Sequence, residues 1–214
     1  MTFAHWLNHT FASFDGGIFA FFNSISNDFL TGFMKFISLI GEKGLIALVP
    51  AVILLLFAKT RKLGFCIGLS VAIGGLITNI TLKNLIDRAR PFTNPEYVGY
   101  WQAVGGEFVK SASFPSGHTT SVMAGAMALF LCGSKKWSWA GFILAILMGI
   151  SRIYLLAHYP TDVIAGLIVG AIAGVSAYYL TKLAYKIVND NAEKPFSIFI
   201  IHSDVRNLFM KKEK

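Results

Sequence analysis

Long apolar stretches separated by short polar segments run through most of this chain of 214 residues. A helix needs about 20 apolar residues to cross the hydrocarbon core of a bilayer. Four stretches are about that long: residues 63–82, 117–133, 138–155 and 162–182. A fifth stretch, residues 44–58, is strongly apolar but short. The pattern predicts an all-α, polytopic membrane helix bundle.

The first apolar segment, residues 18–40, is the weakest candidate span, because polar side chains occupy its first half. These side chains are Asn23, Ser24, Ser26, Asn27 and Asp28. An Asp at the middle of a membrane costs roughly 2.5–3.5 kcal/mol on insertion scales. We expect about six transmembrane helices, with five as the alternative if this segment is an interfacial helix that leads into the next span.

The distribution of Lys and Arg predicts the orientation of the spans. Alternating the spans places residues 59–62, residues 134–137 and the C-terminal tail on one side, and these regions hold 12 of the 19 basic residues. Cytoplasmic loops carry an excess of Lys and Arg. We therefore expect a cytoplasmic C-terminus, with the connections 83–116 and 157–161 on the extracytoplasmic side.

The composition supports a membrane protein and excludes several other classes. Only 14% of the residues are charged, mean hydropathy is +0.60, and there are 19 Phe, whereas a soluble domain has roughly a quarter charged residues. The net charge of +8 sits in short clusters between apolar runs, as a bilayer requires, and not along a nucleic-acid-binding face. Membrane lipids are the expected partners, with no nucleic acid and no obligate protein partner.

The predicted outer side carries cations that the orientation rule does not explain. Lys83 and Arg90 follow the span 63–82, and Arg152 lies near the end of the span 138–155. An anionic ligand at the outer face is the simplest reason for them. Because an arginine can bind two oxygens of a phosphate at once, these side chains are candidate phosphate-binding residues.

The start of the span 117–133 is also suited to an anion. Ser116 is predicted as the N-cap of this helix, and the backbone N–H groups that follow it have no intrahelical acceptor. Such a helix N-terminus binds anions through these groups and the helix dipole. Gly117 allows close approach, and His118 adds a group that can transfer a proton.

The start of the last span adds a candidate nucleophile. Pro160 suits the first helical position, and Asp162 lies in the first turn. The Asp162 carboxylate can then reach back to the ring of His158. That contact would fix one tautomer of the imidazole and leave the other nitrogen as a nucleophile or base.

These residues form three motifs: Lys83-x6-Arg90-Pro91, Pro115-Ser116-Gly117-His118, and Ser151-Arg152-x5-His158-x3-Asp162. Their order and internal spacing resemble the signature of the type 2 phosphatidic acid phosphatase (PAP2) superfamily. The small size and span pattern most resemble bacterial phosphatidylglycerophosphatase B-like enzymes. The resemblance implies a single integral-membrane domain over residues 1–214, with a PAP2/haloperoxidase-like core and the motifs at residues 83–91, 115–118 and 151–162.

The resemblance also implies a mechanism and a location. His158 would attack phosphorus to form a phosphohistidine, with Asp162 orienting its ring, and His118 would act as the acid and then the base. The phosphoryl oxygens would be held by Lys83, Arg90, Ser116, Gly117 and Arg152. No metal and no other cofactor is implied. The protein is expected in the bacterial plasma membrane, with the active site on the extracytoplasmic face.

Two bacterial lipid phosphates fit the resemblance as substrates. Phosphatidylglycerol phosphate, cleaved to phosphatidylglycerol, is narrowly favoured, and undecaprenyl pyrophosphate, the cell-wall carrier, is the alternative. Phosphatidic acid and short prenyl pyrophosphates are further possibilities. A vanadium haloperoxidase is disfavoured because those enzymes are soluble, and a transporter because the chain shows no convincing internal repeat.

Two other groups of residues are assigned weaker expectations. Arg88 is expected to pair with Asp87 or to face solvent, with contact to a lipid headgroup as the functional alternative. The connection 83–116 carries six aromatic residues, expected to form an interfacial aromatic belt, with a lid over the lipid headgroup as the functional alternative. They are Phe92, Tyr97, Tyr100, Trp101, Phe108 and Phe114.

Overall fold

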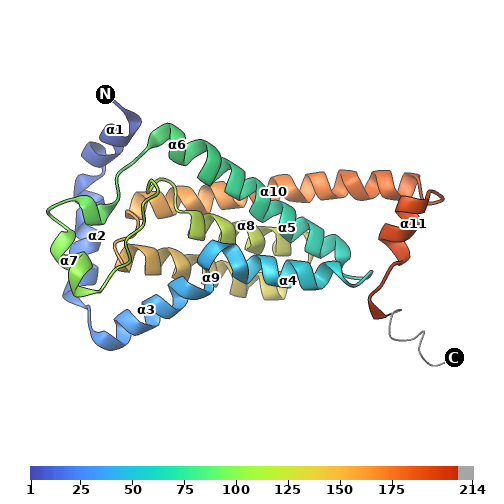
Figure 1. The fold of residues 1–214 in the computed structure, drawn as a ribbon, viewed down its shortest axis with the longest axis horizontal. Helices are drawn as coiled ribbons and strands as arrows, with labels where there is room; N and C mark the ends of the chain where they lie inside the picture. Colours follow the sequence, from blue (N-terminus) through green and yellow to red (C-terminus); the bar gives the residue numbers. More distant parts are fainter. Residues whose placement is uncertain (207–214) are drawn as a thin grey trace.

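The computed structural model describes residues 1–206, apart from the side chain of Lys43. The described chain folds as an elongated bundle of helices, with the N-terminus at one end and the last helix at the other (Figure 1). The end of the basic tail, residues 207–214, lies outside the described residues. The cytoplasmic location of the C-terminus therefore stays a prediction.

Four helices form the centre of the bundle. Helix α8 (Gly117–Cys132) packs against α5 (Arg61–Gly75), α9 (Lys135–Tyr154) and α10 (Pro160–Asp190). The remaining elements are α1 (Phe3–Thr10), α2 (Ala12–Ser24), α3 (Asp28–Ile40), η1 (Glu42–Gly44), α4 (Leu45–Leu55), η2 (Leu76–Leu82), α6 (Lys83–Ile86), η3 (Pro91–Thr93), α7 (Val98–Ala103) and α11 (Pro195–His202).

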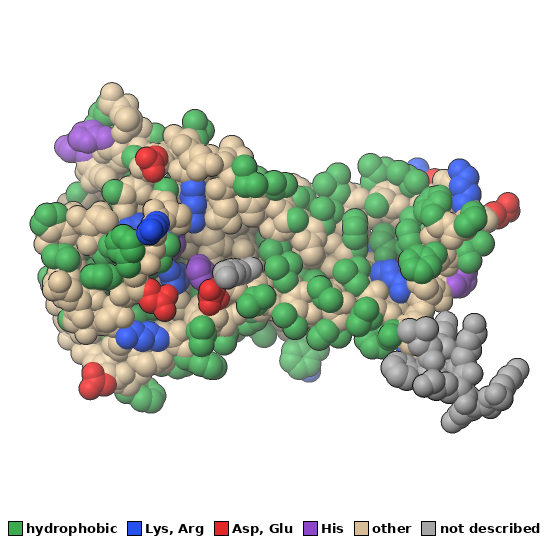
Figure 2. Space-filling model, in the orientation of Figure 1, with side chains coloured by type: hydrophobic (Ala, Val, Ile, Leu, Met, Phe, Trp, Pro, Cys, Tyr) green, Lys and Arg blue, Asp and Glu red, His purple; other side chains and the backbone are tan. Residues whose placement is uncertain are grey.

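The predicted polytopic, all-α fold is confirmed. Large apolar side chains on the outside of α10, such as Ile164, Ile168 and Ile172, are half-exposed, and Figure 2 shows hydrophobic side chains over the flank of the bundle and charged ones near its ends. Among the described residues, four helical stretches are long and apolar enough to cross a membrane: Asp28–Leu55, Arg61–Thr93, Lys135–Tyr154 and Pro160–Asp190. Helix α8 is apolar but shorter. The chain is a multi-pass membrane protein.

The expected first span, residues 18–40, is not one helix. Helix α2 ends at Ser24 and α3 begins at Asp28. The break occurs because the Asn27 side chain accepts a hydrogen bond from the backbone N–H of Leu30 at 2.9 Å, which caps α3. Helix α3 continues through η1 into α4 as one candidate span, which favours the five-span alternative.

Glycines set the close approach of the central helices. A Cβ at Gly166, Gly170 or Gly174 of α10 would lie 2.6–2.9 Å from a backbone oxygen of α8 or of Ser116, which directly precedes it. A Cβ at Gly64 would lie 2.6 Å from the carbonyl oxygen of Ala51 in α4. On α10, small residues at four-residue spacing therefore let the backbones of neighbouring helices approach closely. Gly68, four residues after Gly64, sets no such contact, because a Cβ there would have nothing within 4 Å.

The N-terminal helices α1 and α2 lie across one end of the bundle, beside α7 (Figure 1). Phe19 of α2 is buried, with its ring centroid 4.9 Å from that of Tyr97 and 5.8 Å from that of Tyr159. Phe92 is buried and contacts the rings of Trp101 and Phe108. Aromatic residues of the connection 83–116 thus build a small core at this end of the bundle. Neither the predicted interfacial belt nor the predicted lid included such a core.

Candidate active site

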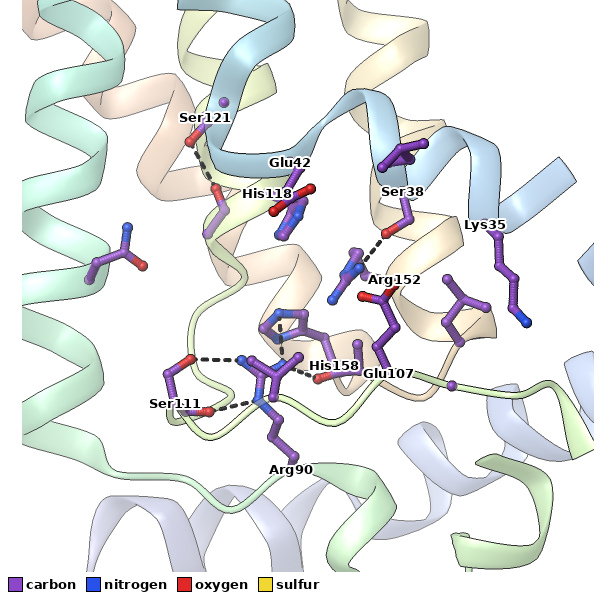
Figure 3. Close-up of a pocket in the computed structure, with 18 of the residues that line it drawn as sticks. Lys35, Ser38, Glu42, Arg90, Glu107, Ser111, His118, Ser121, Arg152 and His158 are labelled. Carbon is purple, nitrogen blue, oxygen red and sulfur yellow. Dashed lines mark hydrogen bonds between the residues drawn. The ribbon is translucent and has the colours of Figure 1, made fainter. Parts of the chain in front are cut away.

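A cavity of about 870 Å³ opens near the end of the bundle that α1, α2 and α7 cover. Figure 3 shows its polar side chains converging from several helices and loops. Six of the predicted site residues line it: Lys83, Arg90, Gly117, His118, Arg152 and His158. The remaining two, Ser116 and Asp162, are fully buried behind this wall.

His158 lies in the turn between α9 and α10, and only 2% of its surface is exposed. Its Nε2 atom is 3.4 Å from Nη1 of Arg90. Burial, together with the charge of Arg90, holds the pKa of His158 well below 6.5. Its imidazole is therefore neutral at neutral pH, and an N–H of Arg90 pointing at Nε2 favours the tautomer with its proton on Nδ1.

Asp162 faces the other nitrogen of the same ring. Its Oδ2 atom lies 3.6 Å from Nδ1 of His158, which is longer than a hydrogen bond, and it accepts the backbone N–H of Tyr159 at 2.9 Å. Its Oδ1 atom accepts a hydrogen bond of 2.6 Å from Arg88. Both carboxylate oxygens are thus held in place, with one of them directed at the histidine.

Arg90 is fixed by the loop that closes the cavity. Its Nε donates to the carbonyl oxygen of Ser111 at 2.6 Å, and its Nη1 donates to that of Ala157 at 2.7 Å. Its Nη2 donates to the Ser111 hydroxyl at 3.1 Å. The guanidinium is therefore preorganised beside His158 and does not need to be ordered by a ligand.

Arg152 keeps an unused donor. The side chain is 5% exposed, and its Nη1 donates to the Ser38 hydroxyl of α3. Its Nε atom is buried with no hydrogen-bond partner among the described residues. Since a buried donor without an acceptor is costly, this atom is suited to a ligand that brings an oxygen.

Gly117 begins α8 and leaves room beside two polar side chains. A Cβ at this position would lie 3.1 Å from Oδ1 of Asn79 and 3.8 Å from Nζ of Lys83. Asn79 belongs to the π-helical segment η2, directly before Lys83 in α6, and π-helical turns are frequent at functional sites. The first turn of α8 can therefore receive an anion between its N–H groups and Lys83.

Ser116 occupies the predicted N-cap position, but its hydroxyl does not cap the helix. It forms a hydrogen bond of 2.9 Å with the hydroxyl of Thr119. The backbone N–H of Ser116 donates to the carbonyl oxygen of Asp162 at 3.0 Å. In this structure Ser116 thus ties the start of α8 to the start of α10 and does not face the cavity.

The structure adds cavity residues that the sequence interpretation missed. They are Lys35, Ser38, Glu42, Asn79, Glu107, Ser111 and Ser121. Lys35 is a cation within an apolar segment, which was a usable signal. Ser38 and Ser111 follow no pattern in the sequence, because their role depends on contacts with Arg152 and Arg90 far along the chain.

The expectation for Arg88 is wrong. This side chain is fully buried and bonds to Asp162 and Asp15, not to its neighbour Asp87. Asp87 has φ 47° and ends α6 in the left-handed region. The chain therefore turns directly after Asp87, and Arg88 enters the protein interior.

Comparisons with known proteins agree with this architecture and site. Residues 63–186 match the PAP2 superfamily. The chain is 37% identical over 145 residues to the Undecaprenyl-diphosphatase of Sulfolobus acidocaldarius, covering 66% of each chain, so the match leaves about a third of that relative's length uncovered. It is 31% identical over 169 residues to the Lipid A 4'-phosphatase of Porphyromonas gingivalis, covering 75% of this chain and 70% of the relative.

A solved structure shows the same fold. The transmembrane PAP2 type phosphatidylglycerolphosphate phosphatase of Bacillus subtilis superimposes with a TM-score of 0.63 at 26% identity, covering 86% of this chain and 90% of that one. A multi-pass helical bundle with a cationic cavity and two histidines at its wall defines a membrane lipid phosphatase. The chain belongs to the PAP2 superfamily.

Proposed function

We propose that the protein hydrolyses the terminal phosphate of undecaprenyl diphosphate, a membrane lipid, through a phosphohistidine intermediate. The observation that carries this proposal is the single cavity in which Lys83, Arg90, His118, Arg152 and His158 meet. In the reaction, one water cleaves the phosphoanhydride to give the lipid monophosphate and inorganic phosphate.

In the first step, Nε2 of His158 attacks the terminal phosphorus in line with the bridging oxygen. The bond from phosphorus to that oxygen breaks, and its electron pair leaves with the lipid monophosphate, which receives a proton from His118. In the second step, His118 takes a proton from water, and the water oxygen attacks the phosphohistidine. Phosphate is released, and His158 returns to its neutral form.

The remaining site residues stabilise the charge of the transferring group. Arg90, the free Nε of Arg152 and Lys83 would bind the phosphoryl oxygens together with the N–H of Gly117. Asp162 would stabilise the cationic ring of His158 from the Nδ1 side. Ser116, placed behind the cavity wall, would act by holding the start of α8. No metal ion takes part in this proposal.

The choice of substrate rests on the relatives and on the cavity wall. The chain is 37% identical to the undecaprenyl-diphosphatase over 145 residues, 31% to the Lipid A 4'-phosphatase over 169 residues and 26% to the phosphatidylglycerolphosphate phosphatase, while a Lipid A 1-phosphatase reaches 40% over only 102 residues. Undecaprenyl-diphosphatases recur among the relatives, and this moves our preference from phosphatidylglycerol phosphate, favoured from the sequence, to undecaprenyl diphosphate. Exposed Phe36 and Leu39 at the cavity edge suit the apolar chain of either lipid.

The second phosphate of a diphosphate also has a candidate partner. Lys35 of α3 lines the same cavity, beyond Arg152 as seen from His158 in Figure 3. In phosphatidylglycerol phosphate, a glycerol with one free hydroxyl separates the terminal phosphate from the phosphodiester, whereas in a diphosphate the second phosphate follows the terminal one directly. Lys35 therefore favours the diphosphate over phosphatidylglycerol phosphate.

We further propose that the cavity faces the extracytoplasmic side of the plasma membrane. This orientation follows from the excess of basic residues in 59–62, 134–137 and the tail. The lipid headgroup would then reach the site from the outer leaflet, and the enzyme would act on the carrier where its glycan has been transferred.

The test is phosphate release by purified protein in detergent with EDTA. Undecaprenyl diphosphate, phosphatidylglycerol phosphate and lipid A are compared at equal concentration, with His158→Ala as the control. We expect a preference for undecaprenyl diphosphate of at least tenfold in kcat/KM. A preference for phosphatidylglycerol phosphate or lipid A overturns the substrate, and release by His158→Ala at the wild-type rate overturns the mechanism.

A further inference from the structure

Behind His158, on the side away from the cavity, a buried arginine lies between two carboxylates. Arg88 and Asp162 have no exposed surface, and Asp15 is 2% exposed. Nη1 of Arg88 donates to Oδ1 of Asp162 at 2.6 Å, and Nη2 donates to Oδ2 of Asp15 at 3.0 Å. Asp162 is thereby joined through Arg88 to an acid from the N-terminal part of the chain.

Arg88 is held on its other sides as well. Its Nε donates to Oδ1 of Asn8 at 2.8 Å, and its Nη1 also donates to the Thr161 hydroxyl at 2.7 Å. Its guanidinium carbon lies 3.8 Å from the ring centroid of Tyr159, a close cation–π contact. A planar group fixed in this way sets the position of the Asp162 oxygen that it binds.

Asp15 is equally well bound. Its Oδ1 accepts the backbone N–H of Thr161 at 3.1 Å, and its Oδ2 accepts the Thr161 hydroxyl at 2.9 Å. Asp15 lies on α2, outside the residues 63–186 that match the superfamily. Helix α2 therefore contributes a buried charge to the back of a site whose predicted residues all come from the matched part.

The charges of this cluster complement the proposed intermediate. With both carboxylates ionised, the two acids and one guanidinium carry one net negative charge in a region closed to solvent, where screening is weak. When Nε2 of His158 bonds to phosphorus, its ring becomes cationic. On the cavity side, Lys83, Arg90 and Arg152 lie next to the ring, and the two acidic residues of the wall, Glu42 and Glu107, act on Arg152. The carboxylate that faces Nδ1 of His158 is Asp162, which belongs to the cluster behind the ring.

We propose that Arg88 is a positioning residue for Asp162 and His158, and that Asp15 acts through Arg88 to supply the net negative charge behind the phosphohistidine. This inference rests on the proposed phosphohistidine mechanism, but not on the choice of lipid. It assigns helix α2, which carries Asp15, a part in catalysis. If the Asp15–Arg88 ion pair were purely structural, it would affect folding but not the rate of the folded enzyme.

The test is a double-mutant cycle with Asp15→Asn, Arg88→Gln and the double variant. Arg88→Lys is added in case Arg88→Gln does not fold. Each purified protein is assayed for kcat and KM with the lipid phosphate that the wild type hydrolyses, and for inhibition by orthovanadate, which mimics five-coordinate phosphorus. Asp204→Asn is the matched control, because Asp204 also pairs with an arginine, Arg206 at 2.7 Å, but follows α11, which lies at the opposite end of the bundle.

We expect Asp15→Asn to lower kcat about tenfold while KM stays within about twofold. The inhibition constant of vanadate should rise by a similar factor, since a bound transition-state mimic loses the same stabilisation. The double variant should be no slower than Arg88→Gln alone, because Asp15 acts through Arg88. Asp204→Asn should match the wild type.

Three results would overturn the inference. The first is a kcat of Asp15→Asn within twofold of wild type. The second is a double variant in which the effects of Asp15→Asn and Arg88→Gln multiply. The third is an Asp15→Asn protein with a reduced active fraction but unchanged inhibition by vanadate. Each of these leaves an active wild type and so spares the proposed function. A wild type that neither releases phosphate nor binds vanadate would overturn both.

Discussion

Nη1 of Arg90 lies 3.4 Å from Nε2 of His158, while Oδ2 of Asp162 lies 3.6 Å from Nδ1 of the same ring. The imidazole is thus placed between a cation and an anion. The cation is on the cavity side, where a phosphoryl group would enter, and the anion is on the buried side. This polarity directs the Nε2 lone pair toward the cavity and the Nδ1 proton toward Asp162.

Removing the His158 ring should abolish turnover and leave the fold intact. His158→Ala deletes the proposed nucleophile from the turn between α9 and α10, outside both helices. We expect kcat to fall at least about 10³-fold, with an unchanged elution profile in detergent. Phosphate release under single-turnover conditions is the measurement.

His202→Ala is the control for that loss, because His202 lies on α11 at the other end of the bundle. It should retain wild-type kcat. If His158→Ala kept more than a tenth of wild-type turnover, the phosphohistidine mechanism would be wrong.

The buried, neutral state of His158 predicts how stability depends on pH. The pKa of His158 is held well below 6.5 by burial and the nearby Arg90, so near pH 6 the unfolded chain binds a proton that the folded protein does not. The stabilisation is fully present above pH 6.5 and is lost as the pH falls below it, at up to about 1.4 kcal/mol per pH unit.

This pH dependence is measured as the free energy of unfolding in detergent between pH 7.5 and pH 5. His158→Gln removes the titrating ring, so its free energy of unfolding should fall less steeply over this range than that of the wild type. Equal slopes for the two proteins would contradict a buried, neutral His158.

Lys35 should distinguish a diphosphate from a monoester. Lys35→Ala removes a cation from the cavity wall but leaves the groups around His158 in place. We expect KM for undecaprenyl diphosphate to rise about tenfold, while KM for phosphatidylglycerol phosphate changes less than twofold. Lys110→Ala is the control, because Lys110 is exposed and lies outside the cavity wall. An equal effect of Lys35→Ala on both lipids would remove the second-phosphate role.

The absence of a side chain at Gly117 should be required for activity. Gly117→Ala places a methyl group 3.1 Å from Oδ1 of Asn79 and 3.8 Å from Nζ of Lys83, where the phosphate is expected. We expect kcat/KM to fall about tenfold or more, since the anion loses its approach to the first turn of α8. Gly17→Ala, also helical but with nothing within 4 Å, should keep full activity. If both variants were equally active, Gly117 would not contact substrate.

Much of the site could be predicted because its residues lie at helix ends on one side of the bundle. Lys83 follows one span, Gly117 and His118 open another, and Arg152 and His158 flank a short turn. Alternation of spans alone brings such ends together. Their spacing then suffices to indicate phosphate chemistry.

The buried side of the site could not be predicted, because its residues come from distant parts of the chain and follow no local pattern. Arg88 and Asp15 are 73 positions apart and meet only because α2 lies across the end of the bundle. The left-handed conformation of Asp87, which turns Arg88 inward, is also not typical of a residue with a side chain. Local patterns carry no signal for either feature.

The orientation in the membrane is open to a direct test. Single cysteines at Gly99 and Ser134, in a background without Cys66 and Cys132, should react with a membrane-impermeant maleimide from opposite faces. Both positions are exposed, and a side chain at Gly99 meets nothing within 4 Å, so neither change should disturb the fold. Because the basic residues favour a cytoplasmic 134–137 connection, we expect Gly99→Cys to be labelled in intact cells and Ser134→Cys only after the membrane is opened. The reverse pattern would place the cavity on the cytoplasmic side, where it would meet lipid phosphates of the inner leaflet.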